Sequence, residues 1–325
     1  MDARTQAEPG APTNNIVGYT DLAGPEVLHL VETPEPTADA GQVVVQVTAA
    51  GVNPIDAKQR AGGRVLPPIE EPRHVGFDGA GVVLEVGPSV SGLNVGDRVA
   101  IVETRGTYTE RLAVDARNAV PIPEGVSDEQ AAAIGIPAST AYQAVRSLGI
   151  EAGDTLLVHA GSGAVGQAAI QFAVDRGARV VATASARKHP RLRQLNAIPV
   201  EYGPGLVERV RAVAPHGITA ILDAAGTDEA IEASLELLEA HDRIGTIVRG
   251  ADAPGWGIQA WSGGSAEPLT LQEVQWRTEA IPLTLDMLAT GRFSVEIGAR
   301  LPLREAVEAH RLLAAGGSGK IILQP

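Results

Sequence analysis

The first third of the chain carries short apolar runs separated by turn residues. Valine-rich runs occupy residues 43–47, 81–86 and 97–102, and segments such as Gly87-Pro88 interrupt them. Runs of this length and spacing, punctuated by glycine, proline, asparagine and aspartate, are typical of an all-β sandwich or barrel. The pattern therefore predicts a β domain from Ile16 to about Glu124.

After Glu124 the pattern changes to apolar strands that alternate with helical segments. Ser127 before Asp128 and Glu129 suits a helix start, because a capping hydroxyl and first-turn acids favour one. Apolar runs lie at 155–159, 179–183, 218–223 and 243–248, with helical stretches at about 165–176 and 228–240. This alternation predicts right-handed βαβ units and a parallel sheet covered by helices on both faces. The fold class is therefore α/β, with a doubly wound domain following the β domain.

The two chain ends have their own patterns. Residues 1–14 are polar and aperiodic, which predicts a disordered tail. Beyond residue 250, Trp256 and Trp261 stand in a glycine-rich stretch and fit core or dimer packing better than a wall for a flat substrate. A long helix at about 270–290, an amphipathic helix at 303–315 and a strand at 319–323 are expected after it.

Composition narrows the class of protein. The 325 residues suffice for two domains, and the absence of cysteine excludes disulfides, thiolate nucleophiles and Cys-ligated zinc. A net charge of −13 argues against general affinity for nucleic acid or an anionic membrane. We see no apolar run of the roughly 18 residues that a membrane span needs and no signal peptide, so we expect a cytoplasmic protein.

A glycine-rich motif, GSGAVG, lies directly between the strand at 155–159 and the following helix. Gly161 suits a tight turn, Gly163 lets backbone approach a pyrophosphate, and Gly166 lets the helix pack closely on the sheet. Ala164 and Val165 would begin the helix, whose unpaired N–H groups favour anions. In a chain with 37 glycines the motif alone is weak, but its place in a βαβ unit favours dinucleotide binding over an ordinary turn.

The next strand end indicates which dinucleotide would bind. NAD-binding proteins place an acid about 20 residues after the turn, whereas this chain continues into Ser185. Residues 185–193 carry four positive charges and no acid, and Ser185, Arg187 and Lys188 suit a phosphate monoester. A solvated basic helix start is the alternative. The position favours NADPH.

Histidines give no sign of a metal site. The seven residues His29, His74, His159, His189, His216, His241 and His310 are scattered, without metal-ligand spacing. We therefore expect each to be structural or exposed, no bound metal, and a metal-free reaction.

Several motifs taken together resemble one family. They are Ala50-Gly51-Val52-Asn53-Pro54-Ile55-Asp56, Gly76-Phe77-Asp78-Gly79-Ala80-Gly81, Val95-Gly96-Asp97-Arg98-Val99, Thr107-Tyr108-Thr109-Glu110, Ser139-Thr140-Ala141-Tyr142, the glycine motif and Gly319-Lys320. In these residues, over about 16–323, the chain resembles the zinc-independent quinone oxidoreductase branch of the medium-chain dehydrogenase/reductase superfamily. Zinc-dependent members carry His-Glu where this chain has Phe77-Asp78.

The resemblance implies a GroES-like catalytic domain built from residues 15–124 and 270–325, with a Rossmann NADPH-binding domain at 125–269 inserted. It implies a cofactor cleft between the two domains and a homodimer. Carried over by position, the cofactor would contact Asn53, Thr140, Ser185, Lys188, Tyr202, Ala224, Val248, Arg249 and Lys320. For Lys320 the cofactor phosphates are the expected partner, and for Tyr202 a half-buried loop position is nearly as good an interpretation.

The implied reaction is hydride transfer from NADPH to a small-molecule acceptor, a quinone or an α,β-unsaturated carbonyl. The catalytic candidates are Asn53, Asp56 and Lys58, although a surface ion pair suits Asp56 and Lys58 better. The tyrosine that some enoyl reductases use has no evident equivalent in residues 57–63. An enoyl-thioester or tailoring reductase acting on C=C or C=N, and an NADPH-binding sensor or structural protein without turnover, are the alternatives.

Overall fold

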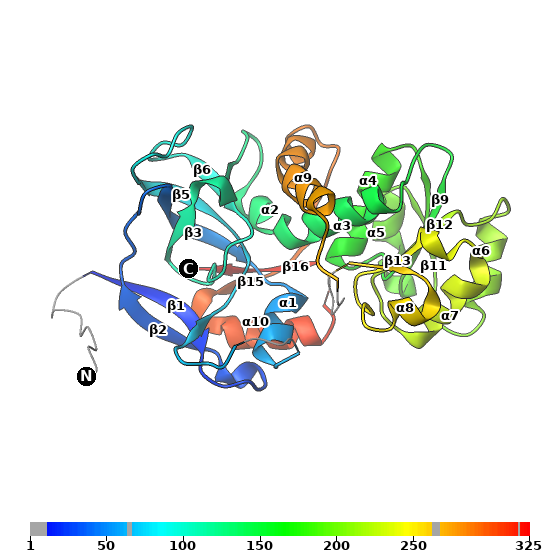
Figure 1. Cartoon of the computed structure of the whole chain (residues 1–325), viewed down its shortest axis with the longest axis horizontal. Helices are drawn as coiled ribbons and strands as arrows, with labels where there is room; N and C mark the ends of the chain where they lie inside the picture. The colour runs from blue at the N-terminus through cyan, green and yellow to red at the C-terminus, as the bar shows by residue number, and fades with distance from the viewer. Residues whose placement is uncertain (1–11, 64–66, 262–266, 318) are drawn as a thin grey trace. The chain divides into compact units, whose positions relative to one another are not determined.

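A computed structural model describes residues 12–63, 67–261, 267–317 and 319–325 (Figure 1). The described residues form two compact units. Residues up to 136 together with 282–325 form the β unit, and residues 137–281 form the α/β unit. The predicted fold class, a β domain joined to a doubly wound parallel-sheet domain, is confirmed.

The unit boundaries, at 136/137 and 281/282, differ from the predicted ones at 124/125 and 269/270. The first boundary lies later because α2 (Asp128–Ala132) packs on the β unit. Thr48 Oγ1 donates to Asp128 Oδ2 at 2.6 Å, and Arg98 forms an ion pair with the same carboxylate. The predicted cap is present, since Ser127 accepts a hydrogen bond from the Gln130 N–H at 3.2 Å.

In the β unit, the long strand β3 is the centre of a sheet with the order β15-β16-β3-β5-β6-β8, and β7 also pairs with β3. A second sheet has the order β2-β1-β4. The strands are β1 (Thr13–Tyr19), β2 (His29–Pro34), β3 (Gln42–Gly51), β4 (Arg73–His74), β5 (Asp78–Val86), β6 (Arg98–Ile101), β7 (Arg111–Asp115), β8 (Ala119–Pro121), β15 (Ile297–Pro302) and β16 (Lys320–Gln324). The unit also contains helices α1 (Pro54–Arg60), α2 and α10 (Ala306–Ala314) and the second part of α9 (Leu271–Ala289).

The register of this sheet brings distant residues together. Gly51 at the end of β3 lies opposite Asp78 of β5 and Ile322 of β16. The starts of β5 and β16 therefore meet the residues that follow β3, beside a core rich in buried valines such as Val43 and Val45.

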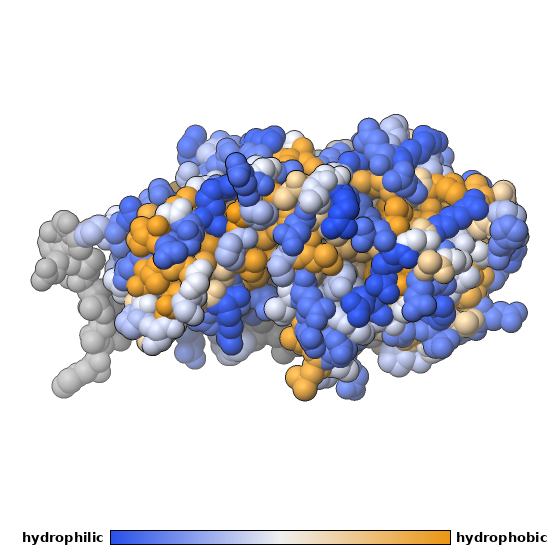
Figure 2. Space-filling model, turned by 90° about the horizontal axis from the view of Figure 1, so that it is seen from above, coloured by the Kyte–Doolittle hydropathy of each residue, from blue (hydrophilic) through white to orange (hydrophobic). Residues whose placement is uncertain are grey.

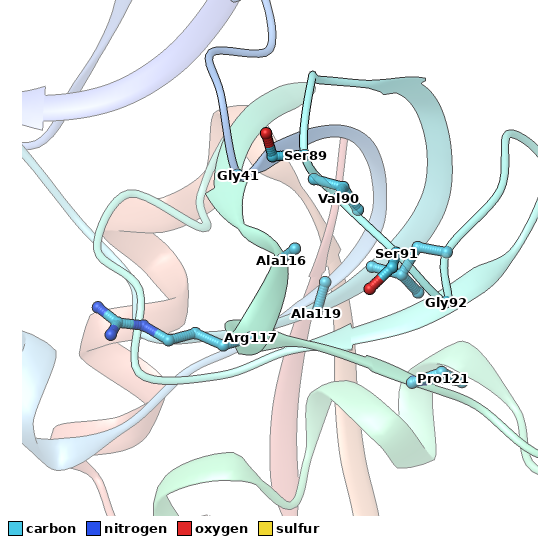
Figure 3. Close-up of a pocket in the computed structure, with 10 residues that line it drawn as sticks. Gly41, Ser89, Val90, Ser91, Gly92, Ala116, Arg117, Ala119 and Pro121 are labelled. Carbon is cyan, nitrogen blue, oxygen red and sulfur yellow. The ribbon is translucent and has the colours of Figure 1, made fainter.

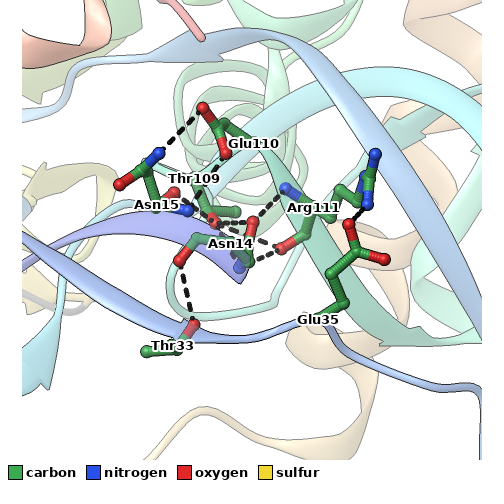
Figure 4. Close-up of polar contacts among 7 residues, drawn as sticks. All are labelled: Asn14, Asn15, Thr33, Glu35, Thr109, Glu110 and Arg111. Atoms are coloured by element: carbon green, nitrogen blue, oxygen red, sulfur yellow. Dashed lines mark hydrogen bonds and ion pairs between the residues drawn. The ribbon is translucent and has the colours of Figure 1, made fainter. Parts of the chain in front are cut away.

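The first described strand, β1, is tied to the segment Thr109–Arg111 by its side chains (Figure 4). The Asn14 amide donates to Thr109 Oγ1 and to the Arg111 carbonyl, both at 3.1 Å, and accepts from the Arg111 N–H at 2.9 Å. Asn15 donates to the Glu110 carboxylate through its backbone and its amide. These bonds explain why strand structure starts at Thr13, inside the predicted tail of residues 1–14, whose first eleven residues lie outside the described part.

The α/β unit has a parallel sheet with the order β11-β10-β9-β12-β13-β14, on which helices pack (Figure 1). Its strands are β9 (Thr155–His159), β10 (Arg179–Thr183), β11 (Ala197–Val200), β12 (Ala220–Asp223), β13 (Ile244–Thr246) and β14 (Gln259–Ala260). Its helices are α3 (Gly135–Ser147), which begins in the β unit, α4 (Ala164–Asp175), α5 (His189–Gln194), α6 (Leu206–Val213), α7 (Asp228–Leu237), α8 (Ala253–Trp256) and the first part of α9 (Leu271–Ala289).

The core of the α/β unit explains the apolar runs of the sequence. Leu157, Val181, Ile221 and Ile244 come from neighbouring strands and are all buried. Trp261 is buried against Gly245, where an added Cβ would lie 2.3 Å from the indole. Core packing, the expected alternative for this tryptophan, is therefore what the structure shows.

The surface mixes hydrophilic and hydrophobic side chains on the face that Figure 2 displays. The exposed large apolar residues are spread along the sequence and include Leu30, Leu84 and Val95, and Leu271 at the start of α9. Within the described ranges, no helix has both the length and the hydropathy that crossing a membrane requires.

Candidate functional site

The α/β unit gathers most of the predicted cofactor residues along one edge of its sheet. Strands β9, β10, β12 and β13 are parallel neighbours, so their carboxyl ends lie at the same edge. This edge is where open parallel sheets bind ligands. The predicted residues that directly follow these strands are Gly161, Gly163, Ser185, Ala224, Val248 and Arg249.

The glycine motif forms the turn between β9 and α4. A Cβ on Gly166 would lie 2.4 Å from the Ala160 carbonyl oxygen, and a Cβ on Gly161 would lie 2.7 Å from the Ala182 Cβ. Gly163 is the N-cap of α4 and is exposed, and a Cβ there would meet its nearest described atom only at 3.4 Å. The turn is therefore closely packed on the protein side and open on the other.

The start of α4 suits an anion. Ala164, Val165 and Gly166 form the first turn, whose N–H groups have no intrahelical acceptor because an α-helix begins there. The cap residue is glycine, which has no side chain to bond them. A phosphate placed at this exposed turn would accept hydrogen bonds from these N–H groups and would be stabilised by the helix dipole. The residues therefore fit the pyrophosphate of a dinucleotide.

The basic run begins where β10 ends. Ser185 is half-buried and precedes a 3₁₀ turn over Ala186–Lys188, in which Arg187 is exposed and Lys188 is buried. Tyr202, after β11, is 56% exposed, which agrees with a surface loop position.

Arg191, which the sequence interpretation left unassigned, connects the basic run to the glycine turn. Its Nε donates to Gln167 Oε1 at 2.8 Å, and the Gln167 amide donates to the Ser162 carbonyl at 3.0 Å. The two predicted cofactor-binding segments are thus joined by hydrogen bonds.

A buried carboxylate organises the opposite part of the edge. Asp223 Oδ1 accepts from the N–H groups of Ala225 and Gly226, both at 2.9 Å, and Oδ2 accepts from Thr246 Oγ1 at 2.7 Å. Thr246 Oγ1 in turn accepts from the N–H groups of Val248 and Arg249. One carboxylate therefore holds both loops that carry Ala224, Val248 and Arg249.

Arg249 itself is engaged on the surface of the α/β unit. Its guanidinium forms ion pairs with Asp228 and Asp252, and these carboxylates hold its pKa above the usual range. The same group lies 5.1 Å from the Trp256 ring centroid.

In the β unit, Asn53, Asp56 and Lys320 meet in a buried polar cluster with Asp78 and Tyr108. The Asn53 amide donates to Asp78 Oδ2 at 2.9 Å and to the Gly51 carbonyl at 3.2 Å. Its Oδ1 accepts from Lys320 Nζ at 2.5 Å, and the same ammonium forms an ion pair with Asp78 at 3.3 Å. Both donor hydrogens of the Asn53 amide are thus used inside the cluster.

Asp56 is the most unusual member of this cluster. It is 2% exposed, and Oδ2 accepts from the Asn53 N–H at 2.8 Å and from the Tyr108 hydroxyl at 2.9 Å. Burial raises the pKa of Asp56 to about 7, and the nearby Asp78 charge adds to this rise against the opposing effects of its donors and Lys320. The surface ion pair favoured from the sequence is therefore wrong for Asp56, whereas Lys58 does lie on the exposed side of α1.

His310 of α10 lies behind Tyr108. The two rings make an edge contact with centroids 6.0 Å apart, and His310 is 1% exposed. Burial lowers the pKa of His310 to about 4, and the positive charge of Arg60 adds to the effect. His310 is thus a neutral core residue, as expected for the histidines.

The structure places the two remaining predicted site residues, Thr140 and Lys320, in buried positions. Thr140 is buried in α3, and its cofactor contact stays a prediction. Lys320 is 5% exposed and committed to Asn53 and Asp78, a different engagement from the predicted one with cofactor phosphates. The sequence interpretation did not assign Asp78 or Tyr108 to the site, although both stand in motifs that carry the family resemblance. A polar side chain next to strands that are expected to be buried is the signal that could have identified them.

Among the described residues, no group of three or more His, Asp or Glu side chains is arranged to hold a metal ion.

Cavities in the β unit lie elsewhere. One of about 370 Å³ is lined by residues of the segments 89–93 and 116–121 and by Gly41, and Figure 3 shows the Arg117 side chain extending away from the other labelled residues. Another, of about 730 Å³, is lined by residues of the segment 67–74 and by Arg105. None of the described lining residues of these two cavities belongs to the predicted site.

Two family models match the chain. The model described as the alcohol dehydrogenase GroES-like domain matches residues 39–124. The model described as zinc-binding dehydrogenase matches residues 196–323.

Curated relatives point in the same direction. The chain is 30% identical to human quinone oxidoreductase over an alignment of 335 positions, which covers 97% of this chain and 98% of the relative. It is 37% identical over 209 residues to a mycocerosic acid synthase-like polyketide synthase of Mycobacterium tuberculosis, with 63% of this chain covered. The match takes up only 10% of that synthase, so the chain corresponds to a small part of it.

A solved structure extends the likeness to three dimensions. The quinone oxidoreductase of Escherichia coli in complex with NADPH superimposes with a TM-score of 0.82 at 26% identity. The superposition covers 96% of this chain and 100% of that one.

Proposed function

The chain belongs to the quinone oxidoreductase branch of the medium-chain dehydrogenase/reductase superfamily, and on this premise we propose that it transfers hydride from NADPH to a quinone or an α,β-unsaturated carbonyl. The observation that carries the cofactor choice is the strand end after β10. A serine and a basic run stand there, joined through Arg191 and Gln167 to the glycine turn. A dinucleotide with a 2′-phosphate fits these residues, and an acid that would repel it is absent from the sequence of this run.

The protein's contribution is binding and orientation, since bound NADPH would supply the hydride from its nicotinamide ring. The turn of α4 would hold the pyrophosphate, and Ser185, Arg187 and Lys188 would hold the 2′-phosphate. The loops fixed by Asp223 would border the nicotinamide ribose through Ala224, Val248 and Arg249. By the family resemblance, Asn53 would line the nicotinamide pocket.

A second candidate is reduction of an enoyl thioester or of a related C=C or C=N bond in a biosynthetic intermediate. The similarity to a polyketide synthase is the observation that favours it. The experiment that separates the two is a comparison of kcat/KM for small quinones, alkyl enones, enoyl thioesters and imines with NADPH. A higher value for enoyl thioesters than for quinones would favour the second candidate.

Asn53 is proposed as the catalytic residue nearest the nicotinamide. Asn53→Ala is expected to lower kcat by at least about tenfold with less than about a threefold change in the Kd for NADPH, because the proposed phosphate contacts do not involve Asn53. Asn94→Ala, at an exposed asparagine, is the control. Unchanged kcat and KM in Asn53→Ala on the preferred acceptor would contradict this role.

The sensor alternative predicts binding without turnover. In that case NADPH would raise the unfolding temperature, because it binds only the folded state, and no acceptor in the panel would be reduced. A homodimer and a cytoplasmic location remain predictions, the first testable by light scattering.

A further inference from the structure

One oxygen in the buried cluster has no partner. Asp56 Oδ1 accepts no hydrogen bond from any residue in the described ranges, although the side chain is 2% exposed. Its other oxygen, Oδ2, already accepts from the Asn53 N–H and the Tyr108 hydroxyl. The carboxyl group is thus bonded on one side only.

This asymmetry fits a neutral acid. An ionised carboxylate would leave a charged oxygen buried and unpaired, whereas a carboxylic acid leaves only a neutral O–H at that position, which is much less costly to bury. The two donors on Oδ2 occupy its lone pairs, so the proton belongs on Oδ1.

The charges around Asp56 support the neutral form. Asp78 at the start of β5 is a neighbouring negative charge, and the Lys320 ammonium of β16 is already bonded to Asp78 and Asn53. From α10, His310 faces Tyr108 as a neutral ring, with the Arg60 charge of α1 near it. Asp78 and Lys320 therefore largely neutralise one another, and the Lys320 charge only partly offsets the burial of an ionised Asp56.

Ionisation of Asp56 would disturb Asn53. A second carboxylate beside Asp78 would compete for the Lys320 ammonium, which holds the Asn53 amide oxygen at 2.5 Å. The Asn53 backbone is also bound to Asp56, at 2.8 Å. Because this competition would draw the ammonium away from the Asn53 oxygen, the Lys320–Asn53 bond is the link through which the charge of Asp56 would act on the Asn53 amide.

We propose that Asp56 is a positioning residue that, as a neutral carboxylic acid, holds Asn53 in place for turnover, and that loss of its proton sets the alkaline limit of kcat. This inference rests on the proposed function, because it assigns the effect to Asn53 at the reacting cofactor. In this proposal Asp56 acts through Asn53, to whose N–H it is bonded, and not on the reacting atoms themselves.

The test compares the pH profiles of kcat for wild type, Asp56→Asn and Tyr108→Phe between pH 5.5 and 9. Wild type is expected to lose activity about tenfold per pH unit above the ionisation of Asp56. Asp56→Asn, which resembles the neutral acid in shape and hydrogen bonding, should keep the low-pH kcat within about threefold of wild type. Its profile should lack the decrease of kcat at high pH, the alkaline limb. Tyr108→Phe removes a donor that favours the ionised form, so the limb should move to higher pH, by about one unit.

Asp21→Asn, at an exposed carboxyl of the same unit, is the control and should keep the wild-type profile. The same alkaline limb in Asp56→Asn as in wild type would overturn the proposal. So would a limb that stays in place in Tyr108→Phe, a variant that tests the idea even if Asp56→Asn folds poorly.

An infrared titration separates this inference from the proposed function. A protonated buried carboxyl gives a C=O band that should disappear as the pH rises in wild type and be absent at all pH values in Asp56→Asn. Absence of the band in wild type at pH 6 would overturn the inference whatever the activity. If the band titrates but no acceptor is reduced, the proposed function fails, and with it the link between Asp56 and turnover.

Discussion

At the residue scale, buried acids and buried histidines change the stability of the protein in opposite directions as the pH rises. The raised pKa of Asp56 means that the folded state holds a proton that the unfolded state has lost between about pH 4 and 7, so this group makes stability fall as pH rises. Burial lowers the pKa of His159 and His310 to about 4, so the unfolded state binds their protons first and stability rises between about pH 4 and 6.5. The measured pH dependence is the sum of both effects.

The variant Asp56→Asn isolates the contribution of Asp56 to this pH dependence. Because both proteins keep the two histidines, the free energy of unfolding of Asp56→Asn minus that of wild type should increase by about 4 kcal/mol from pH 4 to pH 7 or above. Urea unfolding at pH 4.5, 6 and 8 measures this difference. A gap that does not vary with pH would show that Asp56 titrates normally.

Individual residues could be predicted from the sequence only where a local motif marked them. Asn53 and the glycines of the turn were singled out in this way, and their cofactor contacts stay predictions, whereas Asp56 was given a surface role that its burial contradicts. The bond from Lys320 to Asn53 joins residues 267 positions apart, and it depends on the pairing of β16 with β3. Periodicity in a single sequence does not report such pairings.

At the element scale, the turn between β9 and α4 can be tested with two matched glycine substitutions. Gly166→Ala would place a Cβ 2.4 Å from the Ala160 carbonyl, so it should destabilise the protein by about 1–3 kcal/mol. Gly163→Ala has φ −73° and room for a Cβ, so its stability should stay within about 0.5 kcal/mol of wild type. Its Kd for NADPH should rise at least about tenfold, because the new methyl group occupies the phosphate approach.

Urea unfolding and a fluorescence titration with NADPH measure these two quantities. Normal NADPH affinity in Gly163→Ala would argue that the pyrophosphate does not approach this turn.

Helices and strands followed the sequence pattern closely where the pattern was long. The helix expected at about 270–290 is α9 (Leu271–Ala289), and the helix expected at 228–240 ends earlier, at Leu237. The short helix after Ser127 was predicted, but its packing on β3, β5 and β6 was not. Its alanines fit either unit by pattern, and the bonds of Asp128 decide between them.

At the scale of the whole molecule, the chain order explains the split β unit. The last strand, β16, returns to pair with β3 and carries Lys320 into the polar cluster, so residues from both chain ends build one site. The change from valine runs to strand–helix alternation allowed the sequence to predict two domains. The boundaries shifted because packing, rather than pattern, determines where a compact unit ends.

The proposal that the chain is an NADPH-dependent reductase is tested most directly by the ratio of kcat/KM for NADPH to that for NADH. It should be measured with the best acceptor of the panel, in wild type, in Arg187→Ala and in the control Arg211→Ala, whose side chain pairs with Glu236 on the surface. Wild type and the control should favour NADPH by at least about tenfold, as expected for charged hydrogen bonds to a phosphate, and Arg187→Ala should lower that ratio. A wild-type ratio near one or below, or no cofactor oxidation with any acceptor, would contradict the proposal.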